Sequence, residues 1–191
     1  MLKKIELDLS RIREALEATD IKKGTYDSIM NDLSKIDISQ SAKYIKTYSS
    51  YYGMSRFRKD DYKKIYFDFL EKNKYNQALE FSEIINHMYA ETGKCDASFS
   101  SKLLHTVLPD KPIIDSRVVY HLSWKKPQKL HDVIDFYDEM VFRYEEYMKM
   151  RGCAEIIATF DTLFPETHWT PMKKLDTAIW SLGRAGKRGE C

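Results

Sequence analysis

Apolar residues recur every three or four positions along most of the chain, and this helical period is the feature that most restricts the fold. No segment alternates apolar and polar residues with a period of two for long enough to require a half-buried strand. Only 7 Gly and 5 Pro occur among the 191 residues, too few for the many turns of a β-sandwich or barrel. The chain is therefore predicted to be all-α, a compact multi-helix domain of about nine to ten helices.

The apolar stripes predict one helix in each of several segments. In chain order these are 5–16, 26–33, 38–48, 60–69, 75–89, 99–108, 116–122, 127–144, 156–163 and 171–182. Residues 1–182 are predicted to form a single helical domain. The polar, glycine-rich residues 183–191 are predicted to be a frayed tail.

Three helix starts carry local signals. Asp60 or Asp61 can cap the helix that follows them, because an aspartate side chain accepts the free N–H groups of a first turn. Pro127 suits the first turn of the long helix after it. Thr170 followed by Pro171 is a good start for the last helix.

Composition and motifs exclude several classes of function. The net charge of +2, from 31 basic and 29 acidic residues, does not by itself mark a nucleic-acid binder. Cys95, Cys153 and Cys191 form no CxxC pair, and no HxxxH, GxGxxG or GxxxxGK[ST] motif occurs, so no metal and no nucleotide cofactor is predicted. With no apolar leader and no apolar run near the ~20 residues of a membrane span, a cytoplasmic protein with reduced thiols and no membrane partner is expected.

The most informative stretch runs from Ala97 to Leu122. Along this stretch the sequence predicts, in succession, a loop, a short helix, a proline-rich turn, a single carboxylate at Asp115 and a further helix. Asp115 is predicted to be the N-cap of that further helix, where backbone N–H groups would keep its carboxylate ionised. Capping alone explains an aspartate at this position, so a structural and a catalytic role both stay open.

This order resembles the helix-hairpin-helix DNA glycosylases over residues 97–122. In that family a hairpin precedes a helix that can carry a catalytic lysine, and an extended loop then leads to an aspartate at the next helix start. The resemblance implies excision of a flipped-out base, with a carboxylate stabilising the sugar cation or a lysine forming a Schiff base. It implies catalytic roles for Asp115 and Lys102, and a phosphate-gripping hairpin turn formed by Ser98, Ser100 and Ser101.

Candidate contacts to double-stranded DNA lie nearby and in a basic run. Arg117 follows Asp115 by two residues and could bind a phosphate or pair with a carboxylate. From residue 43 to residue 74, nine Lys or Arg face only four acidic residues, and Arg56, Arg58 and Lys59 are the predicted contacts within this run. The neighbouring tyrosines at 48, 51 and 52 could stack on bases or pack in the core.

A second hypothesis is a non-enzymatic helical module for protein–protein interaction. The near-neutral charge and the serines that stand where the family has a glycine-rich hairpin favour it. Such a module would hold a partner peptide or a second copy in a groove between helices, and it would need an exposed apolar patch. Oligomeric state, target lesion and pathway do not follow from the sequence.

Overall fold

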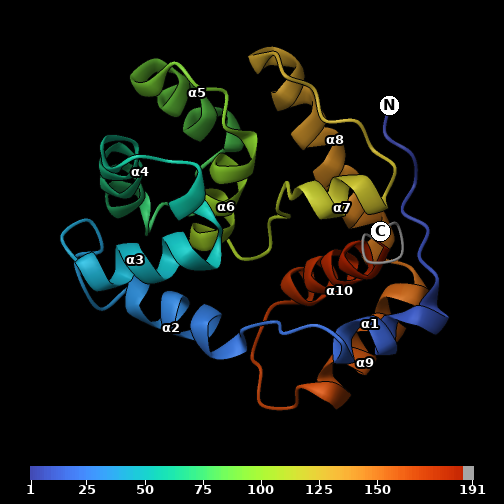
Figure 1. The fold of residues 1–191 in the computed structure, drawn as a ribbon. Helices are drawn as coiled ribbons and strands as arrows, with labels where there is room; N and C mark the ends of the chain where they lie inside the picture. The colour runs from blue at the N-terminus through green and yellow to red at the C-terminus, as the bar shows by residue number, and fades with distance from the viewer. Residues whose placement is uncertain (187–191) are drawn as a thin grey trace. The chain divides into compact units, whose positions relative to one another are not determined.

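A computed structural model describes residues 1–186 of the chain (Figure 1). This range contains ten α-helices and two short 3-10 helices, joined by loops. No residue of that range lies in a strand, so the predicted all-α class and number of helices are confirmed. The chain divides into two compact units. We call Met1–Ile21 with Pro109–Cys191 the terminal unit, and Lys22–Leu108 the central unit.

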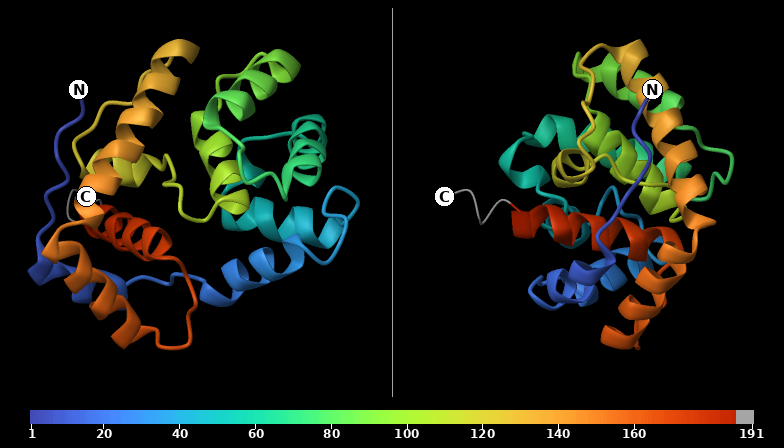
Figure 2. Two further views of the ribbon diagram at one scale, coloured as in Figure 1. Left: turned by 180° about the vertical axis from the view of Figure 1, so that it is seen from behind. Right: turned by 90° about the vertical axis from the view of Figure 1, so that its right-hand side faces the viewer.

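In the terminal unit, the helix α10 packs against α1, α7 and α9 (Figures 1 and 2). The inward side chains of α10 form an apolar stripe that includes Leu175, Ile179 and Leu182. The elements of this unit are η1 (Leu9–Arg11), α1 (Ile12–Glu17), α7 (Ser116–His121), α8 (Leu130–Met148), α9 (Arg151–Leu163) and α10 (Pro171–Gly186).

The start of α10 confirms the prediction for Thr170. Its Oγ accepts the N–H of Lys173 at 3.2 Å and donates to the carbonyl oxygen of Pro109 at 2.8 Å. The helix continues to Gly186, so residues 183–186 of the predicted tail are helical. Residues 187–191 of that tail lie outside the described residues.

The N-terminal segment differs from its prediction. The stripe that begins at Ile5 predicts a helix, yet residues 1–8 are not helical and η1 begins only at Leu9. Partners distant in sequence hold this backbone instead: the Leu2 N–H donates to Glu139 at 2.6 Å, and the Trp124 indole donates to the Lys3 carbonyl at 3.0 Å. Tertiary pairing has therefore replaced the hydrogen bonds of a helix that is marginal by itself.

In the central unit, α6 packs against α5 and α4, and α2 packs against α3 (Figure 1). Every residue of α6 from Phe99 to Val107 is buried, which makes α6 the core helix of the unit. The elements are α2 (Lys23–Leu33), α3 (Ala42–Tyr51), η2 (Met54–Arg56), α4 (Asp60–Asn73), α5 (Phe81–Thr92) and α6 (Ala97–Val107).

Two helix starts in the central unit correct their predictions. The N-cap residue of α4 is Lys59, so Asp60 and Asp61 lie in the first turn, where their charges still favour the helix dipole. The helix predicted from residue 75 begins at Phe81, because Glu80 and Glu83 form a reciprocal capping box there.

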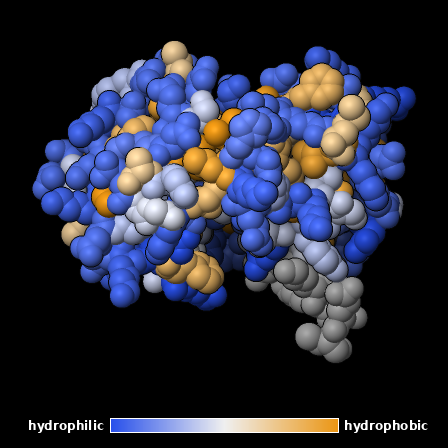
Figure 3. Space-filling model, turned by 90° about the horizontal axis from the view of Figure 1, so that it is seen from above, coloured by the Kyte–Doolittle hydropathy of each residue, from blue (hydrophilic) through white to orange (hydrophobic). Residues whose placement is uncertain are grey.

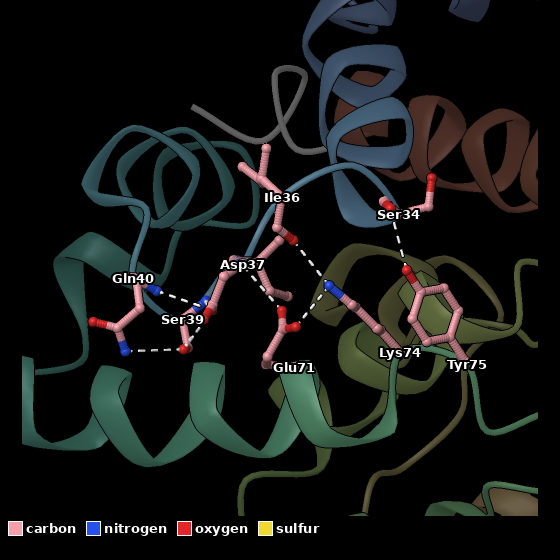
Figure 4. Close-up of polar contacts among 9 residues, drawn as sticks. Ser34, Ile36, Asp37, Ser39, Gln40, Glu71, Lys74 and Tyr75 are labelled. Atoms are coloured by element: carbon pink, nitrogen blue, oxygen red, sulfur yellow. Dashed lines mark hydrogen bonds and ion pairs between the residues drawn. The ribbon is translucent and has the colours of Figure 1, made fainter.

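The loop between α2 and α3 is fastened to the C-terminal end of α4 (Figure 4). The Lys74 ammonium donates to the carbonyl oxygen of Ile36 at 2.9 Å and pairs with Glu71 at 2.6 Å. The Glu71 carboxylate in turn accepts the N–H of Ile38 at 2.9 Å. The side chains of Glu71 and Lys74 thus supply hydrogen bonds to loop N–H and C=O groups that have no partner within a helix or strand.

Hydrophilic residues cover most of the face drawn in Figure 3, and hydrophobic residues appear there as single spots and small groups. No helix among residues 1–186 combines the length and apolarity that crossing a membrane requires.

Candidate functional site

Asp115 stands at the start of α7, as predicted. Its backbone is extended (φ −109°, ψ 141°), and its Oδ1 accepts the N–H of Arg117 at 2.9 Å. The side chain is only half-buried, so a carboxylate held at a helix N-terminus is also accessible. The predicted N-cap is confirmed.

Two side chains hold the backbone that leads to Asp115. Thr170 donates to Pro109, as described above, and the Tyr137 hydroxyl donates to the carbonyl oxygen of Pro112 at 2.9 Å. Thr170, which caps α10, and Tyr137 of α8 therefore order the loop between α6 and α7, and this restricts the position of Asp115.

Asp176 is a buried carboxyl on α10, 5% exposed. Burial raises its pKa to about 6, the positive charge of Lys173 lowers it, and the negative charge of Asp115 raises it. Hydrogen bonds from Ile113 and from the Tyr144 hydroxyl, at 3.4 Å, favour the ionised form. Asp176 is thus a buried carboxyl of the terminal unit whose pKa is also raised by the charge of Asp115.

We expect Asp176→Asn to increase the free energy of unfolding above pH 7 and to have little effect near pH 4. The folded pKa of Asp176 lies above its ordinary value, so the wild type loses this group's contribution as the pH rises from about 4 to 6. The difference between variant and wild type should reach roughly 1–3 kcal/mol. Urea unfolding across pH 4–8 measures it, with the exposed Asp132→Asn as control. A difference that does not change with pH would contradict the expectation.

Arg117 is half-buried and packs on α10. Its guanidinium carbon lies 4.7 Å from the centre of the Trp180 ring. An arginine stacked on an indole keeps its planar donors free at the edges, as phosphate recognition requires. The predicted phosphate contact by Arg117 stays a prediction.

Lys102 lies on α6, and its side chain is buried, with 7% of the residue exposed. The ammonium nitrogen donates to the carbonyl oxygen of Tyr52 at 3.3 Å and to the Ser98 hydroxyl at 3.1 Å. It also lies 5.0 Å from the centre of the Phe99 ring and 5.8 Å from that of Tyr52. Lysine side chains are rarely buried to this extent, so the lysine named from the sequence is unusual in its burial.

The predicted hairpin turn at Ser98, Ser100 and Ser101 is wrong as local structure, because all three residues lie in the first turns of α6. The Ser100 N–H donates to Asp96 at 2.9 Å, so it is not available to a phosphate. Ser100 and Ser101 are also buried. Without glycine the segment has no residue that favours a left-handed turn, and the helix simply begins earlier.

Of the predicted cations in the basic run, Arg56 and Lys59 are exposed and Arg58 is not. Arg58 forms a bidentate ion pair with Asp96, the residue before α6. Its guanidinium also lies 5.2 Å from the centres of the Tyr62 and Phe99 rings. The structure therefore gives Arg58 a role in holding the start of α6.

The tyrosines near the basic run belong to the core. Tyr48 and Tyr52 are buried, and the Tyr48 hydroxyl is hydrogen-bonded to Tyr66 at 2.8 Å and to Thr106 at 3.1 Å. The exposed aromatic ring is Phe57, 65% exposed, between Arg56 and Arg58 in sequence. Sequence reasoning overlooked Phe57, although an aromatic residue with basic neighbours on both sides was the available signal.

Sequence reasoning also overlooked Asp176. A usable signal existed, since Asp176 follows Met172 by four residues and precedes Ile179 by three, which places a carboxylate within the apolar stripe of α10. Asp115 and Asp176 both belong to the terminal unit. Lys102 belongs to the central unit, and its surroundings are described there.

Comparisons with protein-family models, with curated proteins and with solved structures found no match to this chain. Among the described residues, no three His, Cys, Asp or Glu side chains gather as a possible metal site. The candidate functional residues are therefore Lys102 in the central unit and Asp115 in the terminal unit, each with its own neighbours.

Proposed function

We propose that this chain is a DNA-associated protein that acts on damaged or abasic DNA in the manner of helix-hairpin-helix base-excision glycosylases. Lys102 is the proposed amine nucleophile and Asp115 the proposed carboxylate. The observation that carries the proposal is the setting of Lys102: a buried amine with hydrogen bonds to a carbonyl and a hydroxyl, beside two aromatic rings. These contacts hold the amine in one place, and an amine is the group that forms a Schiff base with a sugar.

The proposed chemistry uses the amine of Lys102. The Lys102 nitrogen attacks C1′ of the sugar, and the bond from C1′ to the base or to the hydroxyl breaks, with one amine proton passing to the leaving group. The ring bond from C1′ to O4′ then breaks, O4′ takes the second amine proton, and a C1′=N imine remains. In the glycosylases that residues 97–122 resemble, a carboxylate stabilises the positive charge that develops on the sugar. The resemblance assigns this role to Asp115, which is half-buried at a helix start.

The proposed DNA contact in the central unit is the exposed segment Arg56–Lys59. Arg56 and Lys59 can neutralise phosphates, and the Phe57 ring can stack on an unpaired base or fill the gap at an abasic site. Lys102 and this segment belong to the same unit, and Arg58 links them through its contact with the Phe99 ring.

Binding to a short duplex is expected to weaken steeply with salt, because each phosphate contact releases counterions. Replacing both Arg56 and Lys59 by alanine should reduce the slope of log K against log salt concentration by about 2, for intact and abasic duplexes alike. Phe57→Ala should leave the slope unchanged and weaken abasic binding by roughly 1–3 kcal/mol. Fluorescence anisotropy over a salt series measures both effects.

Lys35→Ala serves as the control for this series, because Lys35 is an exposed lysine of the central unit outside the basic run. An unchanged slope in the Arg56/Lys59 double variant would remove this segment from the DNA contact.

The experiment that tests the proposed function is borohydride trapping on a labelled duplex with a single abasic site. Hydride reduces the imine between Lys102 and C1′ to a stable amine, so protein and DNA migrate together in a denaturing gel. A trapped species that depends on Lys102 supports the proposal. Failure of the wild type both to bind and to be trapped at low salt would favour the protein-interaction module.

A further inference from the structure

Arg58 stands between two exposed residues in sequence, Phe57 and Lys59, yet its own side chain is bound within the chain. Its Nη1 group donates to the carbonyl oxygen of Phe57 at 2.7 Å, and its Nε group donates to the Asp96 carboxylate at 2.7 Å. Its Nη2 group completes the bidentate pair with Asp96. Only 18% of the Arg58 side chain and 13% of the Asp96 side chain are exposed. The guanidinium is therefore directed at its own chain and not extended into solvent.

Asp96 occupies the N-cap position of α6 but does not cap the helix. Its side chain makes no capping hydrogen bond, although aspartate favours this position because its carboxylate can accept a first-turn N–H. The carboxylate is bound instead to Arg58, which lies 38 residues earlier in the chain. The pair thus replaces a local helix cap with a link between the segment around Phe57 and the start of α6.

A second attachment joins the same segment to α6. The Lys102 ammonium donates to the carbonyl oxygen of Tyr52, the residue that precedes residues 53–57, at 3.3 Å. The segment is thus held to α6 by Lys102 at its first end and by Arg58 at its second end. The Phe57 ring, 65% exposed, stands at that second end.

Arg58 and Lys102 also share one aromatic neighbour. The guanidinium carbon of Arg58 and the ammonium nitrogen of Lys102 lie 5.2 Å and 5.0 Å from the centre of the Phe99 ring. The same guanidinium carbon lies 5.2 Å from the centre of the Tyr62 ring. Two rings, a carboxylate and a carbonyl together restrict the orientation of the guanidinium. A single side chain, Arg58, therefore connects the Phe57 backbone with the surroundings of Lys102.

We propose that Arg58 is a positioning residue: it holds the Phe57 carbonyl and the Asp96 carboxylate together, and so fixes the exposed Phe57 ring relative to the Lys102 amine. The inference rests on the proposed function, in which Phe57 and Lys102 are the residues that meet DNA. Arg58 itself touches no DNA, in contrast to the phosphate contact that the basic run predicts for it. A contact group that is ordered before binding loses less conformational freedom on binding, so the positioning should increase affinity.

Backbone relaxation of the full chain, measured by NMR, tests the positioning without DNA. The order parameter of the Phe57 amide should be about 0.85 in the wild type and below about 0.6 in Arg58→Met. Asp96→Ser should lower it as well, because serine can still cap α6 but cannot form an ion pair with Arg58. The Leu108 amide, at the other end of α6, should keep its value in both variants.

An unchanged order parameter at Phe57 in the two variants would overturn the inference, and so would an equal decrease at Leu108. Arg58→Lys replaces Arg58→Met if the methionine variant does not fold. Lysine keeps the positive charge but lacks the planar array of donors, so it cannot hold Asp96 and the Phe57 carbonyl together. The order of Phe57 should therefore decrease in that variant too.

Binding to intact and abasic duplexes distinguishes positioning from a phosphate contact. Arg58→Met and Asp96→Ser should each reduce the preference for abasic DNA at least about fivefold, because both release Phe57. Neither variant should change the slope of log K against log salt concentration, since no phosphate contact is lost. Lys35→Met, which removes an exposed cation of the same unit, should keep the wild-type preference. A slope lower by about 1 in Arg58→Met, without an effect of Asp96→Ser, would make Arg58 a phosphate contact and overturn the inference.

The two kinds of measurement separate this inference from the proposed function. If the wild type binds neither duplex, the proposed function fails, whereas the order parameters still decide whether Arg58 positions Phe57. If the wild type binds abasic DNA more tightly than intact DNA, an equal preference in Arg58→Met would overturn the positioning role and leave the proposed function standing.

Discussion

Lys102→Met is expected to abolish borohydride trapping on abasic DNA while leaving the protein folded and its DNA affinity nearly unchanged. Methionine fills the same narrow space beside Phe99 and Tyr52 but carries no amine. Removal of a covalent nucleophile commonly lowers the rate by roughly 10³-fold or more. Denaturing gels of trapped complexes, with anisotropy binding on the same duplex, measure both quantities.

Lys35→Met is the matched control, since it removes an exposed amine from the same unit and should be trapped like the wild type. Asp115→Asn should bind DNA normally and release no base, because an amide cannot stabilise the positive sugar as a carboxylate does. Trapping of Lys102→Met at the wild-type rate would assign the amine to another residue. Equal base release by Asp115→Asn and wild type would leave Asp115 as a cap only.

Gly183→Ala is expected to lower the free energy of unfolding by about 1–3 kcal/mol, although alanine is the better helix former. A Cβ at this position would lie only 2.6 Å from the carbonyl oxygen of Arg117. That oxygen belongs to the backbone of α7. The steric clash can therefore be removed only if α7 moves away from α10. Urea unfolding of variant and wild type under the same conditions measures the loss.

Gly24→Ala is the matched control for this substitution. Gly24 lies in α2, and nothing is within 4 Å of the position that its Cβ would occupy. The same chemical change should therefore stabilise the protein there, by up to about 1 kcal/mol. If both substitutions increased the free energy of unfolding, α7 could move away from the new methyl group on α10 without loss of stability, and the prediction would be wrong.

The two glycine substitutions also bear on the candidate site. Displacement of α7 from α10 would disturb Arg117, whose guanidinium lies against Trp180, and the Asp115 cap that accepts the Arg117 N–H. Gly183→Ala should thus reduce the protection of the Arg117 amide as well as the overall stability. Packing of these two helices is what places a carboxylate and an arginine together at the start of α7.

Sequence alone determined the features that depend on neighbours a few residues apart. The 3.6-residue period predicted an all-α chain, and short-range capping chemistry predicted the helix starts at Asp115 and Thr170. In each case the donor N–H lies two or three residues after the capping side chain. Such contacts form in any fold that contains the helix, so they can be recognised without the rest of the chain.

Tertiary structure decided everything that depends on distant partners. Ile5 lies outside any helix because Glu139 and Trp124 bind the backbone around it, over 137 and 121 residues of sequence. Gly183, predicted to begin a loose tail, lies inside α10 against the backbone of α7. Neither outcome follows from local propensity, because tertiary packing outweighs the few tenths of a kcal/mol that separate most helix formers.

For the candidate functional residues, too, sequence and tertiary structure each supplied a different part. Its two proposed reacting residues, Asp115 and Lys102, were identified from residue type and order along the chain. The burial of Lys102 beside Phe99 and Tyr52 and the burial of Asp176 on α10 came only from the folded structure. The physical reason is that a carboxylate or an amine acquires its chemistry from the groups around it, and packing brings those groups together from distant parts of the sequence.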